Sequence, residues 1–145
     1  MHGLLLWIHI LAAAVWIGAA TAVVYLAPRM AQNATTGQVF ATAWVAMGRK
    51  LFTPAAIVSL ATGIGLVFDG TTSFSAGFVS IGFLMVVIGG VVGARVYAPA
   101  GRQIAAAHES GAETAALYAR VRTINLVELA LLAFTVYAMA TKLGA

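Results

Sequence analysis

The sequence predicts an all-α fold in which a bundle of four helices crosses a lipid bilayer. Hydrophobic residues make up 62% of the 145 residues and charged residues only 8%, whereas soluble domains carry about 25% charged residues. The apolar residues gather into four long runs, and ~20 such residues suffice for a helix to cross the hydrocarbon core. Four spans with their loops use nearly the whole chain, so we expect a single membrane domain covering residues 1–145.

The first predicted span covers residues 4–27 and is closed by Pro28 and Arg29. The run is longer than the apolar core of a signal peptide, and the three residues before it include no Lys or Arg. A signal peptide normally begins with a basic segment followed by a shorter apolar core. We therefore interpret this run as a retained transmembrane helix.

The second and third predicted spans form a helical hairpin. The second covers residues 51–68 and has Pro54 in its first turn, where the missing N–H of proline costs little. Residues 69–73 are polar and include a glycine, which predicts a short turn. The third run covers residues 74–98 and ends at Pro99.

The fourth predicted span covers residues 124–143. Two longer connectors, residues 28–50 and 99–122, separate the first span from the second and the third from the fourth. The first connector carries apolar side chains at helical spacing, and the second is rich in alanine. We expect both to be helical, either as extensions of the spans or as helices at the membrane surface.

The basic residues predict the orientation of the bundle. All but one of the eight Lys and Arg residues lie in or beside the two connectors: Arg29, Arg49, Lys50, Arg95, Arg102, Arg120 and Arg122. Short basic loops stay in the cytoplasm. We therefore expect a multi-pass protein of the inner (cytoplasmic) membrane, with both connectors in the cytoplasm and with both termini and the 69–73 turn outside.

Several classes of function are disfavoured by the composition. The chain has no cysteine, which excludes disulfides, thiolate metal sites and thiol catalysis. It has no phosphate-binding glycine loop after a strand and no His-Glu-x-x-His motif. The basic residues flank the spans, so the lipid bilayer is the expected partner and nucleic acid is not. We find no catalytic set and no convincing internal repeat.

His9 is the first polar residue inside a predicted span, and Trp16 lies on the same helical face seven residues later, among alanines. Polar groups in lipid are costly and tend to be functional. One interpretation is an interhelical hydrogen bond from His9 to Thr or Asn. The other is a metal ligand, for haem iron before copper.

The fourth span carries a seam of residues spaced by three and four: Asn125, Glu128, Leu132, Thr135, Met139 and Lys142. Most of these are poorly suited to lipid, so the seam should face the interior of the bundle. An ionised carboxylate inside a bilayer needs a partner. We expect Glu128 to pair with Arg95 near Asn125, and a proton relay is the alternative role for this group.

Met139 is predicted to lie at the depth of His9. His9 is five residues from the outer end of the first run, and Met139 is four residues from the outer end of the fourth. His and Met form an axial pair for haem iron and also a soft site for Cu(I), although Met139 is equally suited to packing. His2 is a weaker candidate for a cupric ion, and His108 is expected to be solvated.

The stretch Ile8-His9-Ile10-Leu11, followed by Val15-Trp16-Ile17-Gly18, resembles the first helix of the CopD-like superfamily of small integral membrane proteins. That group includes copper-resistance proteins and the HemJ-type protoporphyrinogen oxidases. Further stretches resemble the family's later helices: Leu51-Phe52-Thr53-Pro54, Thr62-Gly63-Ile64-Gly65-Leu66, Gly93-Ala94-Arg95-Val96, Asn125 with Glu128, and Met139-Ala140-Thr141-Lys142.

The resemblance implies a four-helix membrane bundle and, for the HemJ-type branch, haem b or a related porphyrin bound through His9. That branch has a functional lysine early in its third helix, where Gly82 is the nearest position here and residues 74–98 contain no lysine. Because this lysine is missing, the resemblance leaves open whether the protein is an oxidase.

We expect a haem- or porphyrin-binding protein, acting in electron transfer, haem handling or porphyrin oxidation, with His9, Trp16 and Met139 at the cofactor. Copper transport or resistance and a ligand-free accessory subunit are the alternatives. A homodimer is left open, because one chain offers a single well-placed histidine.

Overall fold

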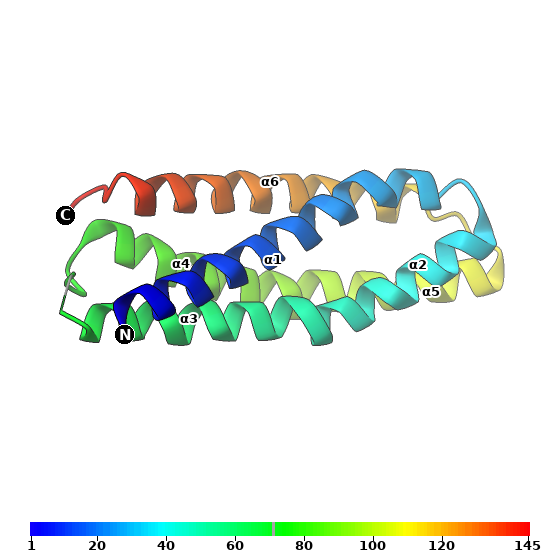
Figure 1. Cartoon of the computed structure of the whole chain (residues 1–145). Helices are drawn as coiled ribbons and strands as arrows, with labels where there is room; N and C mark the ends of the chain where they lie inside the picture. The colour runs from blue at the N-terminus through cyan, green and yellow to red at the C-terminus, as the bar shows by residue number, and fades with distance from the viewer. Residues whose placement is uncertain (71) are drawn as a thin grey trace.

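The computed structural model describes residues 1–70 and 72–145. Thr71, which belongs to the expected 69–73 turn, lies outside the described residues. The described chain is helical and contains no strand. Four helical rods lie roughly along one direction (Figure 1), and each is long and apolar enough to cross a membrane. The predicted all-α fold with four potential membrane spans is confirmed.

The four rods contain six α-helices and two π-helical segments among the described residues. In chain order these elements are α1 (His2–Met30), α2 (Ala34–Met47), η1 (Gly48–Phe52), α3 (Thr53–Phe68), α4 (Gly77–Val92), η2 (Gly93–Tyr97), α5 (Ala98–Ser110) and α6 (Ala115–Ala140). The second rod is continuous from α2 to α3 and the third from α4 to α5. The two connectors are therefore largely helical, and α2 and α5 extend the second and third rods.

The ends of the third and fourth rods that lie near the C-terminus differ from the predicted spans. The apolar runs cover residues 74–98 and 124–143, but α4 begins at Gly77 and α6 ends at Ala140. The two ends contact each other, and the Gly77 N–H donates to the Gly144 carbonyl at 2.9 Å. Residues 74–76 and 141–144 form turns or bends instead of helix.

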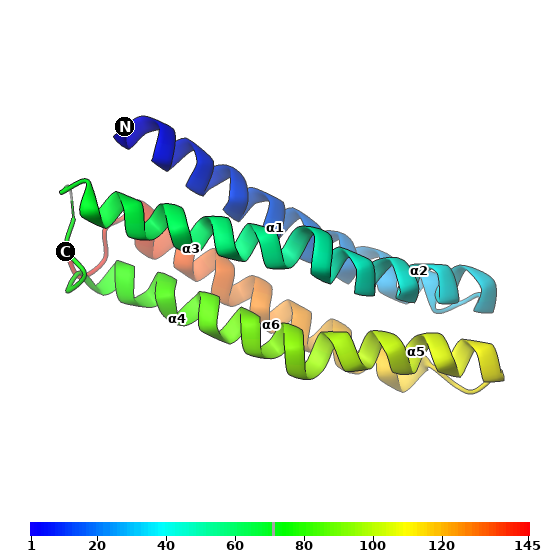
Figure 2. The same ribbon diagram turned by 90° about the horizontal axis from the view of Figure 1, so that it is seen from below.

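The first rod crosses the others at an angle. Seen from two directions, α1 begins beside α3 and ends beside α6 (Figures 1 and 2), and it packs against both helices. Beyond the π-helical segments, α2 and α5 pack against each other. The N- and C-termini lie at the same end of the bundle (Figure 1), as an even number of crossings requires.

A short repeated pattern explains the two π-helical segments and corrects our expectation that the chain has no repeat. Residues 48–54 and 93–99 each read glycine, any residue, a basic residue, an aliphatic, an aromatic, a small residue and proline. Proline has no N–H for the carbonyl four residues earlier. The residue before each proline donates its N–H to the carbonyl five residues earlier, as in a π-helix. These hydrogen bonds join Thr53 N–H to Gly48 O and Ala98 N–H to Gly93 O.

The buried apolar residues form clusters at three levels of the bundle. The largest lies where α2 and α5 meet the first and last helices and contains Val23, Ala27, Ala41, Trp44, Ile104, Tyr118 and Val121. The second surrounds Trp16 with Ala55, Met85 and Leu132. A third joins Val67 to Ala76 and Val79 near the termini. Many large apolar side chains of the rods remain exposed, which is compatible with contact with a lipid bilayer.

Candidate ligand and polar sites within the bundle

His9 is hydrogen-bonded from α1 to α3. Its Nδ1 lies 2.9 Å from the Ser59 carbonyl oxygen and 3.0 Å from Thr62 Oγ1. The Thr62 hydroxyl donates its own proton to the Val58 carbonyl at 2.6 Å, so its oxygen is an acceptor for His9. Because both neighbours of Nδ1 are acceptors, Nδ1 carries the proton, and Nε2 bears the lone pair of the neutral ring.

Gly63 of α3 lies beside the imidazole. A Cβ at Gly63 would lie 3.4 Å from His9 Cε1, in ordinary van der Waals contact with the ring. The predicted interhelical hydrogen bond from His9 to a threonine is thus present. It occupies only one ring nitrogen. Nε2 has no hydrogen-bond partner among the described residues, and it is not one of their fully buried unpaired atoms.

A second polar site joins three helical rods at Glu128. The Trp16 indole N–H donates to Glu128 Oε1 at 3.3 Å, and the Tyr97 hydroxyl donates to Oε2 at 2.5 Å. Glu128 and Trp16 are each only 5% exposed. Gly89 on α4 makes room for the indole, because a Cβ there would lie 2.7 Å from Trp16 Cη2.

The predicted ion pair between Glu128 and Arg95 is wrong. Arg95 is exposed, and the one ion pair among the described residues joins other groups. Arg95 and Tyr97 both belong to η2, where the wider π-helical turn changes which side chains face the interior. Tyr97, which we had not predicted as a site residue, therefore partners Glu128, and the carboxyl group is held by two neutral donors.

The seam on α6 faces the interior over most of its length. Asn125, Glu128, Leu132 and Thr135 are buried, as predicted. Asn125 is 1% exposed, and its Oδ1 has no hydrogen-bond partner among the described residues. Lys142 departs from the prediction, because it lies beyond the end of α6 in an exposed turn with a positive φ of 50°.

Met139 packs against Gly82 of α4. A Cβ on that glycine would lie 2.5 Å from the Met139 methyl carbon. His9 contacts α3, so the two side chains expected to form an axial pair contact different helices. A larger residue at position 82 would require Met139 to move.

The other two histidines are held by hydrogen bonds. His2 Nδ1 lies 3.0 Å from Asp69 Oδ2. His108, which we expected to be solvated, is half-buried, and its Nε2 lies 3.2 Å from the Tyr118 hydroxyl. Tyr118 in turn donates to the Gly37 carbonyl at 3.1 Å. Within the described part of the chain, no three His, Asp or Glu side chains gather as a metal-binding group.

Comparison with protein-family models, curated proteins and solved structures gave no match to this chain. The resemblance to the CopD-like superfamily stays a prediction. We therefore assign the candidate sites from the geometry of the bundle.

Proposed function

We propose that this chain is a multi-pass membrane protein that binds haem or a related porphyrin through Nε2 of His9. The supporting observation is the hydrogen bond between His9 Nδ1 and the Ser59 carbonyl, together with the open Nε2. Metal-ligating histidines usually donate their second ring N–H to a backbone carbonyl or carboxylate, which fixes the tautomer and the ring orientation. In this proposal, both termini lie outside and the α2 and α5 ends lie in the cytoplasm.

The surroundings of His9 fit one axial ligand to a porphyrin metal. Leu6 and Ala13 lie about one turn on either side of His9 along α1, and both are partly exposed. A bound porphyrin thus has apolar side chains to contact beside the nitrogen. Haem would supply a redox-active iron. The chain itself supplies the axial nitrogen, and Ser59 and Thr62 orient it.

The roles of Trp16 and Met139 in this proposal follow from their contacts. Trp16 donates to Glu128 and Met139 packs on Gly82, so the metal bond is assigned to His9 alone. A second axial ligand would come from His9 of a second copy, which makes a homodimer part of the proposal. Copper transport has less support, because His2 already pairs with Asp69 and Met139 contacts a different helix from His9.

A haemin titration of the purified protein in detergent tests the proposal, with quenching of tryptophan fluorescence as the signal. Trp7 lies two residues from His9 and is exposed, so bound haemin should quench it. We expect tight, saturable binding by the wild type and by His2→Ala, and only weak binding by His9→Ala. Thr62→Val, which removes one acceptor from Nδ1, should weaken binding by about tenfold, as outer-shell changes do.

Metal-free protoporphyrin is the control ligand in the same titration. If His9 binds the iron, the metal-free ring should bind the wild type and His9→Ala equally weakly. The proposal would be wrong if haemin bound wild type and His9→Ala with equal affinity, or if haemin showed no saturable binding to the wild type.

A further inference from the structure

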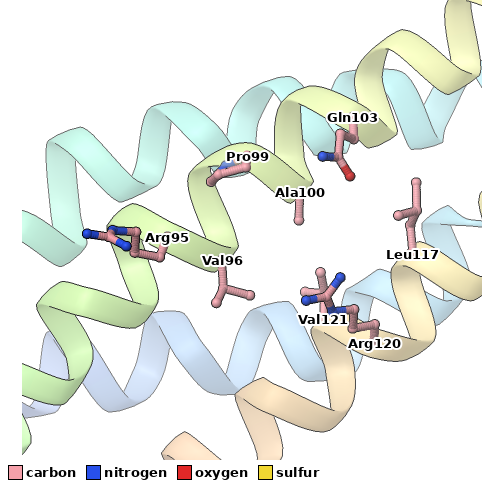
Figure 3. A pocket seen from close by; sticks show the side chains of 8 residues that line it. All are labelled: Arg95, Val96, Pro99, Ala100, Gln103, Leu117, Arg120 and Val121. Carbon is pink, nitrogen blue, oxygen red and sulfur yellow. The ribbon is translucent and has the colours of Figure 1, made fainter.

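A pocket lies between the third and fourth rods, where η2 and α5 face the first turns of α6 (Figure 3). Its polar lining consists of Arg95, Gln103 and Arg120, and its apolar lining includes Val96, Leu117 and Val121. In Figure 3, the Arg120 and Gln103 side chains reach into the space between the helices, and Arg95 lies at one end of it. The pocket thus combines two cations with an apolar wall.

The positive charge of this pocket is not neutralised by any acidic side chain of the described residues. Arg95 and Arg120 are exposed and form no ion pair there. The acidic residues are engaged or lie elsewhere. Asp69 contacts His2, Glu109 accepts from Gln38, Glu128 is held by Trp16 and Tyr97, and Glu113 lines a different pocket.

The pocket lies at the level where the apolar part of the bundle ends. Arg95 is near the end of the apolar run 74–98, and Arg120 comes four residues before the run 124–143. Lipid phosphates lie at this boundary of the hydrocarbon core. A guanidinium group offers several N–H donors in a planar arrangement that matches phosphate oxygens, and it binds them more specifically than an ammonium does.

We propose that this pocket binds the phosphate headgroup of an anionic phospholipid. Arg120 binds the phosphate, Arg95 at the end of the pocket adds positive charge, Gln103 hydrogen-bonds the polar headgroup, and an acyl chain lies along Val96 and Leu117. Basic pockets between transmembrane helices at the cytoplasmic face bind such headgroups. The inference depends on the membrane setting of the bundle and not on porphyrin binding, because His9 lies on α1 and no residue of α1 lines this pocket.

Lipid retention measured by native mass spectrometry tests this site. The purified protein is mixed, in detergent, with phosphatidylglycerol or with phosphatidylcholine of the same acyl chains. We expect the wild type to retain phosphatidylglycerol in preference to phosphatidylcholine. Arg95→Gln/Arg120→Gln should lose about tenfold of that retention, as loss of charge-assisted hydrogen bonds predicts, and Arg120→Gln alone should lose part of it.

The matched control is Arg102→Gln/Arg122→Gln, which removes the same charge from two exposed arginines that do not line the pocket. We expect this control to keep the wild-type preference. Equal losses in the two double variants, or equal retention of the two lipids by the wild type, would overturn the site. Millimolar inorganic phosphate should not displace phosphatidylglycerol, and displacement would show that the pocket takes free phosphate instead of a lipid.

Discussion

Substitution of Gly89 by alanine should destabilise the bundle because it removes the space that the Trp16 indole occupies. The added Cβ would lie 2.7 Å from Trp16 Cη2, closer than real Cβ contacts. The indole is rigid, and it also donates a hydrogen bond to Glu128. The clash therefore cannot be relieved by a small side-chain rotation without disturbing the polar site.

The magnitude follows from a comparison with Gly90, the next residue of the same helix. A Cβ at Gly90 has no atom within 4 Å. Both substitutions gain the helix propensity of alanine, up to ~1 kcal/mol per residue, so this gain cancels between the two variants. The remaining difference is the cost of overpacking, which is about 1–3 kcal/mol in a well-packed interior.

The assay is unfolding of the detergent-solubilised protein by increasing sodium dodecyl sulfate, followed by circular dichroism. Gly90→Ala should be at least as stable as the wild type, and Gly89→Ala should have a lower free energy of unfolding than Gly90→Ala by about 1–3 kcal/mol. Equal stability of the two alanine variants would refute the close contact between Trp16 and α4.

Two further predictions concern the second polar site and the orientation. Tyr97→Phe should lower the free energy of unfolding by about 1.5–3 kcal/mol, because Glu128 loses a donor to a buried carboxyl group, whereas Tyr25→Phe, at an exposed position, should be close to neutral in the same unfolding assay. Because the chain has no cysteine, a single cysteine can report the orientation: an impermeant maleimide should label Ser75→Cys on intact cells and Ser110→Cys only after permeabilisation. The reverse labelling pattern would contradict the orientation that the basic residues predict.

The number of spans was predictable from the sequence because it depends only on the lengths of apolar runs. The interior face of α6 was also predictable, since Asn125, Glu128, Leu132 and Thr135 share one side of a helix and all but the leucine are unfavourable in lipid. One of the two interpretations of His9, a hydrogen bond to Thr or Asn, is also present, with Thr62 as the partner. These features follow from one helix or from residue chemistry alone.

The partner of Glu128 was not predictable in the same way because it depends on backbone geometry. If residues 93–98 are assumed to form a regular helix, nothing in the sequence favours Tyr97 over Arg95 as the partner of Glu128. In the structure these residues form a π-helical turn, in which Tyr97 contacts Glu128 and Arg95 is exposed. The signal was nevertheless present in the sequence, since the glycine-to-proline spacing in residues 48–54 is repeated in residues 93–99.

The predicted ligand pair of His9 and Met139 could not be checked from the sequence, because it depends on how the helices pack. Their similar depth followed from counting residues along antiparallel spans. The helix against which each side chain packs depends on the crossing of α1, which runs from α3 towards α6 (Figure 1). Gly63 lies beside His9 and Gly82 leaves space for Met139, and these partners cannot be identified from one sequence.

The optical spectrum of the protein, purified from cells supplied with excess haem, tests the central claim most directly. With His9 as the axial ligand, the wild type should carry a Soret band that shifts on reduction. The band should be absent from His9→Ala and retained in His2→Ala at equal protein concentration. A colourless wild type, or a Soret band of equal intensity in His9→Ala, would contradict the account.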